Sequence, residues 1–504
     1  MKLTFSPNYQ TGKANPMLYG HFLEHFQRQI YGGVYDPESP FADEDGFRTD
    51  VLEALRRIKP PIIRWHGGCF VSAYDWHLGV GKERIPNFDK AWRVEESNEF
   101  GTDEFIKFCR KLGCEPYICT NGGTGTAEDM SNWVEYCNLR KMGRFAKERI
   151  ANGYEEPHNV KYWSIGNENW GAHEIGEKTA EEWSRLVQES AKMMLRVDPT
   201  LQLSAAAHTY ENQDWNLRLL KEAGGYLDWI SIHSYWIGAH DGITFPNYNS
   251  IILRTGDDLS APINRVRAHL TAYGLEKKIK IAYDEWNLRG WYHPYVMDMW
   301  NREDKRNEDE AFYNYLINER NKSDINATYT MVDAIFAGCF LNTCLRNCDL
   351  VQMACFSPVV NTRGAIFTHK DGIVLRPTYF VFDLYANLLK DTVLEQWTEN
   401  VPTVTGSVDN RERTVGLVDA VVTYGDGAYA IAAINKDPEQ AQTMELRMLD
   451  DSVTEMRIHT VNGPSTGSYN DIDRTEVGVT VSEWTAFSGS ITLEPHSVNV
   501  IELR

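Results

Sequence analysis

The sequence predicts an α/β protein: a (β/α)8 TIM barrel followed by a C-terminal antiparallel β-sandwich domain. Eight short apolar runs alternate with amphipathic helical patterns over residues 17–390, and strict alternation of this kind is typical of a parallel barrel. After residue 391 the helical period is lost, and short strands separated by turn residues follow. A chain of 504 residues is also too long for one ordinary hydrophobic core, which favours two domains.

The predicted barrel domain, 17–390, contains eight strands and the helices between them. In the first predicted helix, Phe47, Val51, Leu55 and Ile58 recur at helical spacing. The predicted strands are 17–24, 61–65, 115–121, 160–168, 201–207, 227–235, 279–286 and 351–357. The helices are expected at 46–58, 102–112, 180–197, 215–223 and 309–316, with one more at 378–389 after the last strand.

The C-terminal region, 391–504, is expected to form the β-sandwich. Two predicted strands, 414–422 and 428–434, flank an Asp-Gly step at Asp426, and this dipeptide favours a tight hairpin. The N-terminal strand within 1–16 is expected to join this domain. Further strands are expected at 453–460, 477–481, 490–493 and 498–503.

Composition and charge exclude several classes of partner. A formal net charge of −20 argues against nucleic acid and anionic membranes, since both require a basic surface. No run of about 18 apolar residues predicts a membrane span. The nine cysteines lack a Cys-x-x-Cys pattern and the N-terminus lacks a signal-peptide pattern, so we expect a cytoplasmic protein. The 14 histidines form no cluster with ligand spacing, so we expect neither a catalytic metal nor a cofactor.

Two glutamates stand where predicted strands end. Glu168 follows a buried strand and Gly166, and Glu285 follows the run 279–283. Because the carboxyl ends of barrel strands form the active-site face, the two side chains are expected to lie close together. Paired carboxylates are the minimum equipment for glycosidic cleavage by acid/base and nucleophilic chemistry. The apolar, aromatic surroundings of Glu168 predict a raised pKa, as a general acid requires. A lone glutamate at such a strand end more often caps the following helix or forms a structural ion pair.

The residue pattern leaves one choice open at the seventh strand. Asp284 and Glu285 are adjacent, and successive side chains on a strand face opposite ways, so only one of them can point into the site. The strand alone does not indicate which. Tyr235, at the end of the sixth strand, is a candidate donor to the ionised acid, although a tyrosine at a barrel rim commonly serves packing instead.

Four segments share the order and spacing of one enzyme family. They are Gly166-Asn167-Glu168, Tyr283-Asp284-Glu285-Trp286-Asn287, Gly20-His21-Phe22-Leu23-Glu24-His25 and Arg64-Trp65-His66-Gly67-Gly68-Cys69. Together they resemble glycoside hydrolase family 51, whose characterised members are mostly α-L-arabinofuranosidases. The resemblance covers nearly the whole predicted barrel. It implies Glu168 as the acid/base, Glu285 rather than Asp284 as the nucleophile, and His233 packed beneath the site. It further implies a substrate-binding set of Glu24, Cys69, Asn167, Tyr235, Trp286 and Gln352.

On this resemblance we expect a retaining, exo-acting α-L-arabinofuranosidase. Its substrate would be an arabino- or arabinoxylo-oligosaccharide carrying a terminal non-reducing arabinofuranosyl unit. Family members are commonly hexamers, so a homo-oligomer is expected from the resemblance alone. His66, Cys69 and the loop 290–294 depart from the usual family pattern, which leaves the leaving group open. Two alternatives stay open: the same mechanism on a β-xyloside, β-glucan or galactofuranoside, and a non-catalytic sugar-binding protein on the same barrel.

Overall fold

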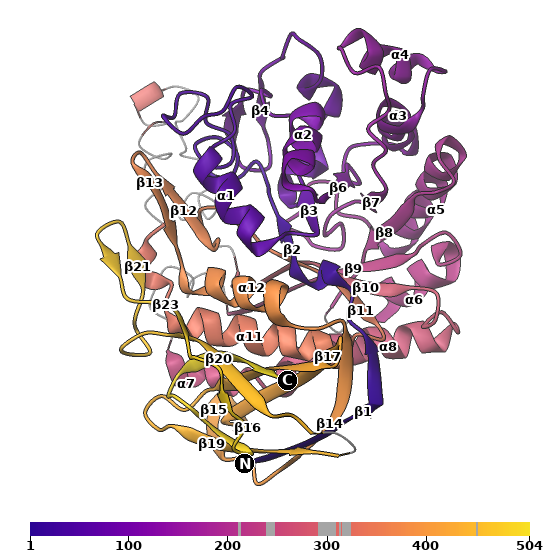
Figure 1. Cartoon of the computed structure of the whole chain (residues 1–504). Coiled ribbons are helices and arrows are strands. Elements are labelled where there is room, and N and C mark those ends of the chain that lie inside the picture. The colour runs from indigo at the N-terminus through magenta and orange to yellow at the C-terminus, as the bar shows by residue number, and fades with distance from the viewer. Residues whose placement is uncertain (210–212, 238–246, 291–308, 312–313, 315–323, 450–451) are drawn as a thin grey trace.

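The computed structural model contains a closed eight-stranded barrel and a separate ten-stranded sheet (Figure 1). It describes all residues except 210–212, 238–246, 291–308, 312–313, 315–323 and 450–451. The loop at 290–294 therefore lies largely outside the described residues, as does half of the predicted helix at 309–316.

The barrel confirms the predicted TIM architecture. Its strands close in the order β10-β11-β2-β3-β6-β7-β8-β9, and every neighbouring pair is parallel. Each strand overlaps one of the eight predicted runs. The strands are β2 (Gly20–Phe22), β3 (Ile62–Trp65), β6 (Glu115–Thr120), β7 (Tyr162–Ile165), β8 (Gln202–Ala206), β9 (Trp229–Ile237), β10 (Lys280–Arg289) and β11 (Val351–Phe356).

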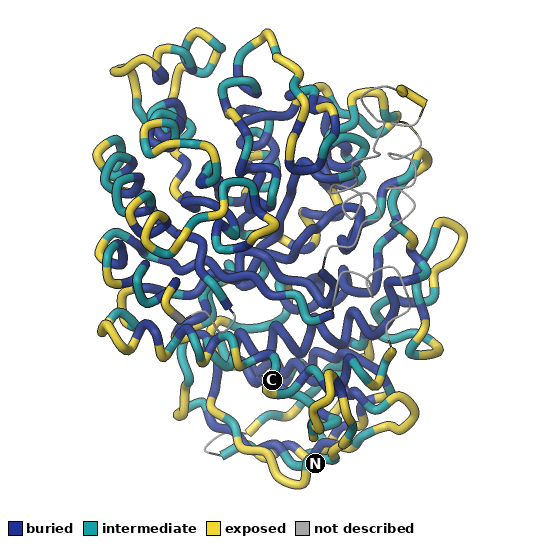
Figure 2. The backbone as a smooth tube through the Cα atoms, turned by 180° about the vertical axis from the view of Figure 1, so that it is seen from behind, coloured by how far each residue is buried: buried dark blue, intermediate teal, exposed yellow. Residues whose placement is uncertain are grey.

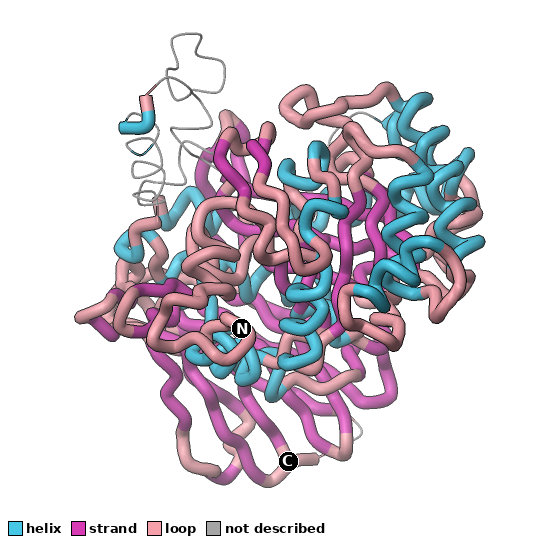
Figure 3. Tube along the Cα trace, turned by 90° about the horizontal axis from the view of Figure 1, so that it is seen from above, coloured by secondary structure: helices cyan, strands magenta, loops and turns pink. Residues whose placement is uncertain are grey.

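Helices lie along the outside of the barrel strands (Figure 3). Helix α5 shows how the sequence specifies them: Thr179 and Glu182 form a reciprocal capping box at its start, and Trp183, Val187 and Met194 form its buried face. The described helices are α1 (Thr49–Ile58), α2 (Thr102–Leu112), α3 (Ala127–Asn138), α4 (Arg144–Ala151), α5 (Ala180–Val197), α6 (Gln213–Ala223), α7 (Tyr248–Leu253), α8 (Asp257–Ala272), α11 (Met331–Arg346) and α12 (Pro377–Leu388).

The C-terminal strands form one sheet in the order β23-β20-β26-β18-β17-β14-β1-β19-β25, with β24 paired to β20. The N-terminal strand β1 lies inside this sheet, antiparallel to β14 and parallel to β19. These strands are β1 (Lys2–Lys13), β14 (Thr392–Glu399), β17 (Val418–Gly425), β18 (Ala428–Asn435), β19 (Gln442–Met448), β20 (Glu455–Asn462), β23 (Gly478–Val481), β24 (Thr485–Ala486), β25 (Ser490–Leu493) and β26 (Ser497–Leu503).

The predicted hairpin at Asp426 is confirmed, because β17 and β18 pair up to Gly425 and Ala428. The single predicted strand 414–422 is wrong: it is divided between β16, which pairs with β15, and β17. The strand is interrupted at Leu417, whose N–H donates to the carbonyl of Pro402. Short two-stranded ribbons complete the fold: β4 (Asn87–Asp89) with β5 (Val94–Glu96), β12 (Ile366–His369) with β13 (Gly372–Leu375), β15 (Thr403–Val408) with β16 (Arg411–Gly416), and β21 (Asn470–Asp471) with β22 (Arg474–Thr475).

Two buried layers hold the molecule together. Helices α11 and α12 pack between the barrel and one face of the C-terminal sheet (Figure 1), and Gly338 of α11 approaches Ile434 of β18 so closely that a Cβ would lie 2.7 Å from Cδ1. The other face encloses its own core, in which Phe5 packs against Tyr429. Figure 2 shows the barrel strands buried and the exposed residues gathered in loops and outer helices. In the described parts of the chain, no helix combines the length and apolar character needed to cross a membrane.

Candidate active site

A pocket of about 310 Å³ opens at the carboxyl ends of the barrel strands. Six of the eight predicted site residues line it together, so the structure gathers side chains that are up to 261 positions apart, from Glu24 to Glu285. The pocket is lined by Glu24, Gly68, Cys69, Ala91, Trp92, Asn167, Glu168, Trp170, His173, Ile175, His233, Tyr235 and Glu285.

Glu285 points into this pocket from β10, and Asp284 does not. The Oε1 atom of Glu285 accepts a hydrogen bond from Nη1 of Arg64 at 2.6 Å, and Oε2 accepts one from the Tyr235 hydroxyl at 2.7 Å. Asp284 is fully buried and accepts a hydrogen bond from the Tyr117 hydroxyl at 2.8 Å. Arg64 and His233 each contact both acids, because the pairing of β10 with β9 shifts register between Ala282 and Glu285 and interrupts the regular alternation of the strand. Glu285 therefore lines the pocket, while Asp284 lies buried in the barrel interior.

Arg64 connects the two halves of the site. Its guanidinium is fully buried, and besides contacting Glu285 it donates from Nη2 to Oδ1 of Asn167 at 2.8 Å. The same Asn167 oxygen accepts the N–H of Gly68 at 3.0 Å. A buried guanidinium requires compensating acceptors, so removing either partner would leave an uncompensated charge. Arg64 belongs to one of the four segments that carry the family resemblance, but the sequence alone indicates no role for its side chain.

A left-handed turn after β7 presents Glu168 to the pocket. Gly166 has φ +69° and Glu168 itself has φ +46°, a conformation that side chains other than glycine seldom adopt. The N–H of Asn167 donates to Oδ1 of Asn169 at 3.0 Å and closes the turn. Backbone strain is therefore concentrated at the residue whose carboxylate enters the pocket.

Gly166 cannot carry a side chain in this turn. A Cβ would lie 2.2 Å from Oδ1 of Asn169 and 2.2 Å from Cη2 of Trp183. We expect Gly166→Ala to lower the free energy of unfolding by about 2–4 kcal/mol, measured in denaturant melts, and to reduce activity by displacing Glu168. Gly153→Ala is the matched control, because Gly153 has φ +106° but nothing within 4 Å of its Cβ position. An equal loss of stability in both variants would contradict the steric account.

Both oxygens of Glu168 are held by histidines. Oε1 lies 2.6 Å from Nδ1 of His233, and Oε2 lies 2.7 Å from Nε2 of His173. Burial pulls the pKa of Glu168 upward, but the hydrogen bonds and charges of the two histidines outweigh burial and hold the pKa below its ordinary value. The predicted raised pKa of Glu168 is therefore wrong in this structure, because no pattern in the sequence indicates these two histidine partners.

His233 lines the pocket instead of packing beneath it. Burial lowers the pKa of His233, but the carboxylates of Glu285, Asp284 and Glu168 outweigh burial and raise its pKa to about 10. One oxygen of Glu168, one of Glu285 and a ring nitrogen of His233 all lie within 4.8 Å of one another. The His233 imidazole thus contacts both of two closely spaced carboxylates through its Nδ1 atom.

Glu24 follows β2 and lines the pocket next to Gly68. Its Oε1 accepts hydrogen bonds from Nε1 of Trp92 at 2.9 Å and from the N–H of Phe70 at 3.3 Å. Burial and the nearby negative charge of Glu285 raise the pKa of Glu24 well above its ordinary value. Trp92 is carried by the turn between β4 and β5, a ribbon that the sequence did not predict.

Glu174 is a further acid that sequence reasoning missed. It is buried, and its Oε1 accepts hydrogen bonds from the Ser72 hydroxyl and from Nδ2 of Asn167, the latter at 3.4 Å. Burial raises the pKa of Glu174 to about 7. Burial also raises the pKa of the neighbouring Cys69 thiol, which favours its neutral form.

Two predicted substrate-binding residues do not lie in the pocket. Trp286 faces away from it, fully buried, and its ring stacks on Phe340 of α11 at 4.0 Å between centroids. Trp286 directly follows Glu285 on β10 and points to the other side of the sheet. Gln352 is the second residue of β11, at the amino end of the strand, about 13 Å from the end at Phe356. Just after the end of this strand, Ser357 contacts a residue of the pocket: its Oγ accepts a hydrogen bond from the Tyr235 hydroxyl at 3.1 Å.

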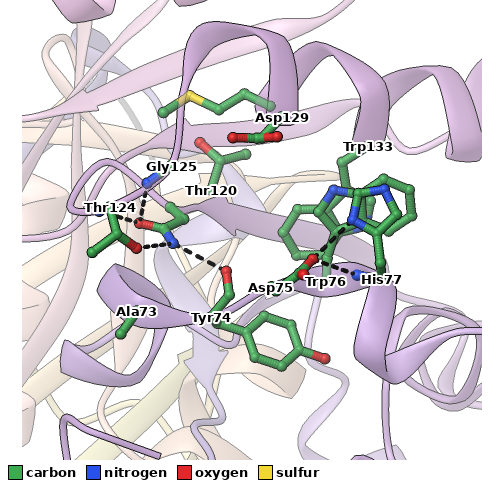
Figure 4. Close-up of a pocket in the computed structure, with 12 residues that line it drawn as sticks. Ala73, Tyr74, Asp75, Trp76, His77, Thr120, Thr124, Gly125, Asp129 and Trp133 are labelled. Atoms are coloured by element: carbon green, nitrogen blue, oxygen red, sulfur yellow. Dashed lines mark hydrogen bonds and ion pairs between the residues drawn. The ribbon is translucent and has the colours of Figure 1, made fainter. Parts of the chain in front are cut away.

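A second cavity, of about 360 Å³, lies where the segment 73–77 meets the amino end of α3 (Figure 4). Four of its polar side chains bind one another in pairs: Nδ2 of Asn121 donates to Oγ1 of Thr124 at 3.0 Å, and Nδ1 of His77 lies 2.8 Å from Oδ1 of Asp75. Among the described residues, none lines both cavities. The pocket with the paired glutamates is therefore the candidate active site.

Comparison with known proteins agrees with this geometry. Family models of the α-L-arabinofuranosidase 1 domain and the α-L-arabinofuranosidase C-terminal domain match residues 54–242 and 284–497. The chain is 34% identical to the intracellular exo-α-(1→5)-L-arabinofuranosidase 1 of Bacillus subtilis, over 88% of this chain and 86% of that protein. The family 51 α-L-arabinofuranosidase of Thermotoga petrophila RKU-1 superposes with a TM-score of 0.85 at 33% identity, covering 100% of both chains. The chain belongs to the α-L-arabinofuranosidases of glycoside hydrolase family 51.

A solved α-L-arabinofuranosidase from Thermotoga maritima, in complex with arabinose, is similar to the same extent. It superposes on this family member with a TM-score of 0.84 at 33% identity, covering 99% of each chain. This family 51 member is therefore an enzyme, a glycoside hydrolase, and the predicted family is confirmed.

Proposed function

We propose that this enzyme is a retaining α-L-arabinofuranosidase that releases terminal non-reducing arabinofuranosyl units from arabino- or arabinoxylo-oligosaccharides. The observation that carries the proposal is the separation of the two carboxylates, whose facing oxygens lie within 4.8 Å. Retaining glycosidases hold their carboxyl groups about 5–5.5 Å apart, whereas inverting enzymes need about 6.5–9.5 Å to admit a water molecule. The short separation favours direct attack by one carboxylate on the sugar.

Glu285 is the proposed nucleophile. An attacking carboxylate must be ionised and fixed in position, and the Arg64 guanidinium supplies the counter-charge while Tyr235 holds the second oxygen. Glu285 attacks the anomeric carbon as the glycosidic bond breaks, and a glycosyl-enzyme forms. Water then attacks this intermediate and releases the sugar with its original configuration.

Glu168 is the proposed acid/base. It protonates the leaving oxygen in the first step and accepts a proton from the attacking water in the second. Its origin on a different strand end from Glu285, with Nδ1 of His233 2.6 Å from Oε1 of Glu168 and 3.6 Å from Oε2 of Glu285, supports this division of roles, since both carboxylates can reach one anomeric centre.

The pocket supports an exo mode of action on a small sugar unit. Its volume of about 310 Å³ lies at the low end of the roughly 300–1,000 Å³ typical of small-molecule sites. Glu24, Asn167 and Cys69 are the proposed contacts to the sugar hydroxyls, because each presents a polar atom to the pocket. The B. subtilis relative carries the description exo-α-(1→5), which supports arabino-oligosaccharides as substrates. A homo-oligomer and a cytoplasmic location stay predictions.

A panel of aryl glycosides tests the substrate class. We expect kcat/KM for 4-nitrophenyl α-L-arabinofuranoside to exceed that for the matching β-D-xylopyranoside, β-D-glucopyranoside and β-D-galactofuranoside by at least about 100-fold, since a misplaced hydroxyl leaves buried polar groups unpaired. A higher kcat/KM on any of the other glycosides than on the arabinofuranoside would contradict the proposed substrate and identify that glycoside as the substrate instead. Binding of arabino-oligosaccharides without turnover of any member of the panel would instead support a sugar-binding protein.

A further inference from the structure

The two histidines that hold Glu168 differ in their surroundings. His233 is buried, with 5% of its side chain exposed, and its Nδ1 lies 3.6 Å from Oε2 of Glu285 as well as 2.6 Å from Oε1 of Glu168. His173 has 50% of its side chain exposed and contacts Oε2 of Glu168. Oε1 therefore lies on the nucleophile side of the site, and Oε2 lies on the solvent side, next to His173.

Because both oxygens of Glu168 are hydrogen-bonded to histidines, the proton that it must deliver to the leaving group has to come from a neighbouring residue. The acid/base must be protonated when the leaving group departs, yet two histidine partners favour the ionised form of Glu168 in the resting enzyme. A proton must therefore be held within hydrogen-bond reach of the carboxylate. Nε2 of His173, 2.7 Å from Oε2, satisfies this condition on the solvent side.

We propose that His173 is a positioning residue that stores the catalytic proton for Glu168. The inference rests on the proposed acid/base role of Glu168. In the first step the proton moves from Nε2 of His173 to Oε2 of Glu168 and on to the leaving oxygen, while the glycosidic bond breaks and Glu285 bonds to the sugar. In the second step Glu168 removes a proton from water as the Glu285–sugar bond breaks. That proton returns to Nε2, so the cycle neither gains nor loses a proton.

The groups facing His173 suit this role. The hydrogen bond to Glu168 raises the pKa of His173 above its ordinary value, and the charges of Glu174 and Glu285 act in the same direction, while burial opposes them. The Cys69 thiol lies within 4.8 Å and is kept neutral by burial, and the Trp170 ring lies 5.6 Å away between centroids.

His233 is less suited to store this proton. Three carboxylates surround it and raise its pKa to about 10, so its imidazolium holds its proton too firmly to release it near neutral pH. His233 instead supplies a lasting positive charge between Glu168 and Glu285. Of the two histidines on Glu168, His173 is therefore the one whose proton can leave and return.

The test compares His173→Gln and His173→Lys with the unmodified enzyme on two substrates. Phenyl α-L-arabinofuranoside needs acid assistance, whereas the 2,4-dinitrophenyl compound does not. For His173→Gln we expect kcat/KM for the phenyl substrate to fall about 10- to 100-fold at neutral pH, and its alkaline limb to move to lower pH. The rate of glycosyl-enzyme formation from the dinitrophenyl substrate should change less than about 3-fold. His173→Lys keeps the positive charge, but its ammonium has an ordinary pKa of about 10.4 and should not restore the phenyl rate.

Several results would overturn the inference. Equal losses on both substrates with an unshifted pH profile would indicate a merely structural role, and full rescue by His173→Lys would indicate that only charge matters. The partly exposed His77, outside the active-site pocket, provides the matched control as His77→Gln. Glu168→Ala separates this inference from the proposed function. If Glu168→Ala leaves the phenyl rate unchanged, the proposed function fails; if it abolishes that rate while His173→Gln shows no substrate dependence, only the proton-store role fails.

Discussion

Replacing Glu285 with alanine is expected to lower kcat on 4-nitrophenyl α-L-arabinofuranoside by at least about 10⁴-fold. The variant lacks the atom that bonds to the sugar, so no glycosyl-enzyme can form and azide cannot divert one. The Arg64 guanidinium also loses its Oε1 partner at 2.6 Å. Steady-state kinetics with and without azide provide the measurement, with circular dichroism to show that the barrel is folded.

Asp284→Asn is the informative companion to Glu285→Ala. Asp284 is buried beneath the pocket and bound to Tyr117, so this variant should lose stability while retaining a functional nucleophile. A burst of aryl alcohol from Asp284→Asn and none from Glu285→Ala is the expected pattern. The reverse pattern would show that Asp284 is the nucleophile.

Replacing Glu168 with alanine is expected to have an effect that depends on the leaving group. The loss should reach about 10²- to 10⁴-fold on the phenyl substrate, which needs a proton on its leaving oxygen. On the dinitrophenyl substrate the first step should proceed, and the glycosyl-enzyme should accumulate because no base activates water. Azide needs no such base, so added azide should restore turnover and give the arabinosyl azide with retained configuration.

The exposed Glu177 in the same loop gives a control variant, Glu177→Ala, that should behave like the unmodified enzyme. The division of roles fails if Glu168→Ala and Glu285→Ala respond alike to azide. It also fails if Glu168→Ala lowers the rate by the same factor on the phenyl and dinitrophenyl substrates. Removal of a general acid must slow the substrate with the poorer leaving group more.

The barrel could be predicted from the sequence because its strands are buried on both faces and read as continuous apolar runs. The strand end at Glu168 was visible for the same reason, since an acid interrupts such a run. Strand boundaries could not be predicted where the alternation of apolar and polar residues continued from one strand into the next. The run 414–422 contains such a break at Leu417, and only the pairing partners, β15 on one side and β14 with β18 on the other, divide it.

The errors in the site have two physical causes. Trp286 and Gln352 were assigned to the pocket by resemblance, although Trp286 directly follows Glu285 on β10 and therefore points to the other side of the sheet. The pKa of Glu168 was predicted from burial alone. The partners that reverse it come from β9 and from a half-exposed loop position, His173, and neither periodicity nor composition indicates which loop side chain will reach a carboxylate five residues earlier.

Mass spectrometry of the Glu168→Ala variant tests the central claim most directly. The protein is incubated with the dinitrophenyl α-L-arabinofuranoside, quenched with acid and digested. We predict one added pentosyl group on the peptide that contains Glu285, and its disappearance when azide is added before the quench. An adduct on a different peptide, or steady hydrolysis without any adduct, would contradict double displacement through Glu285.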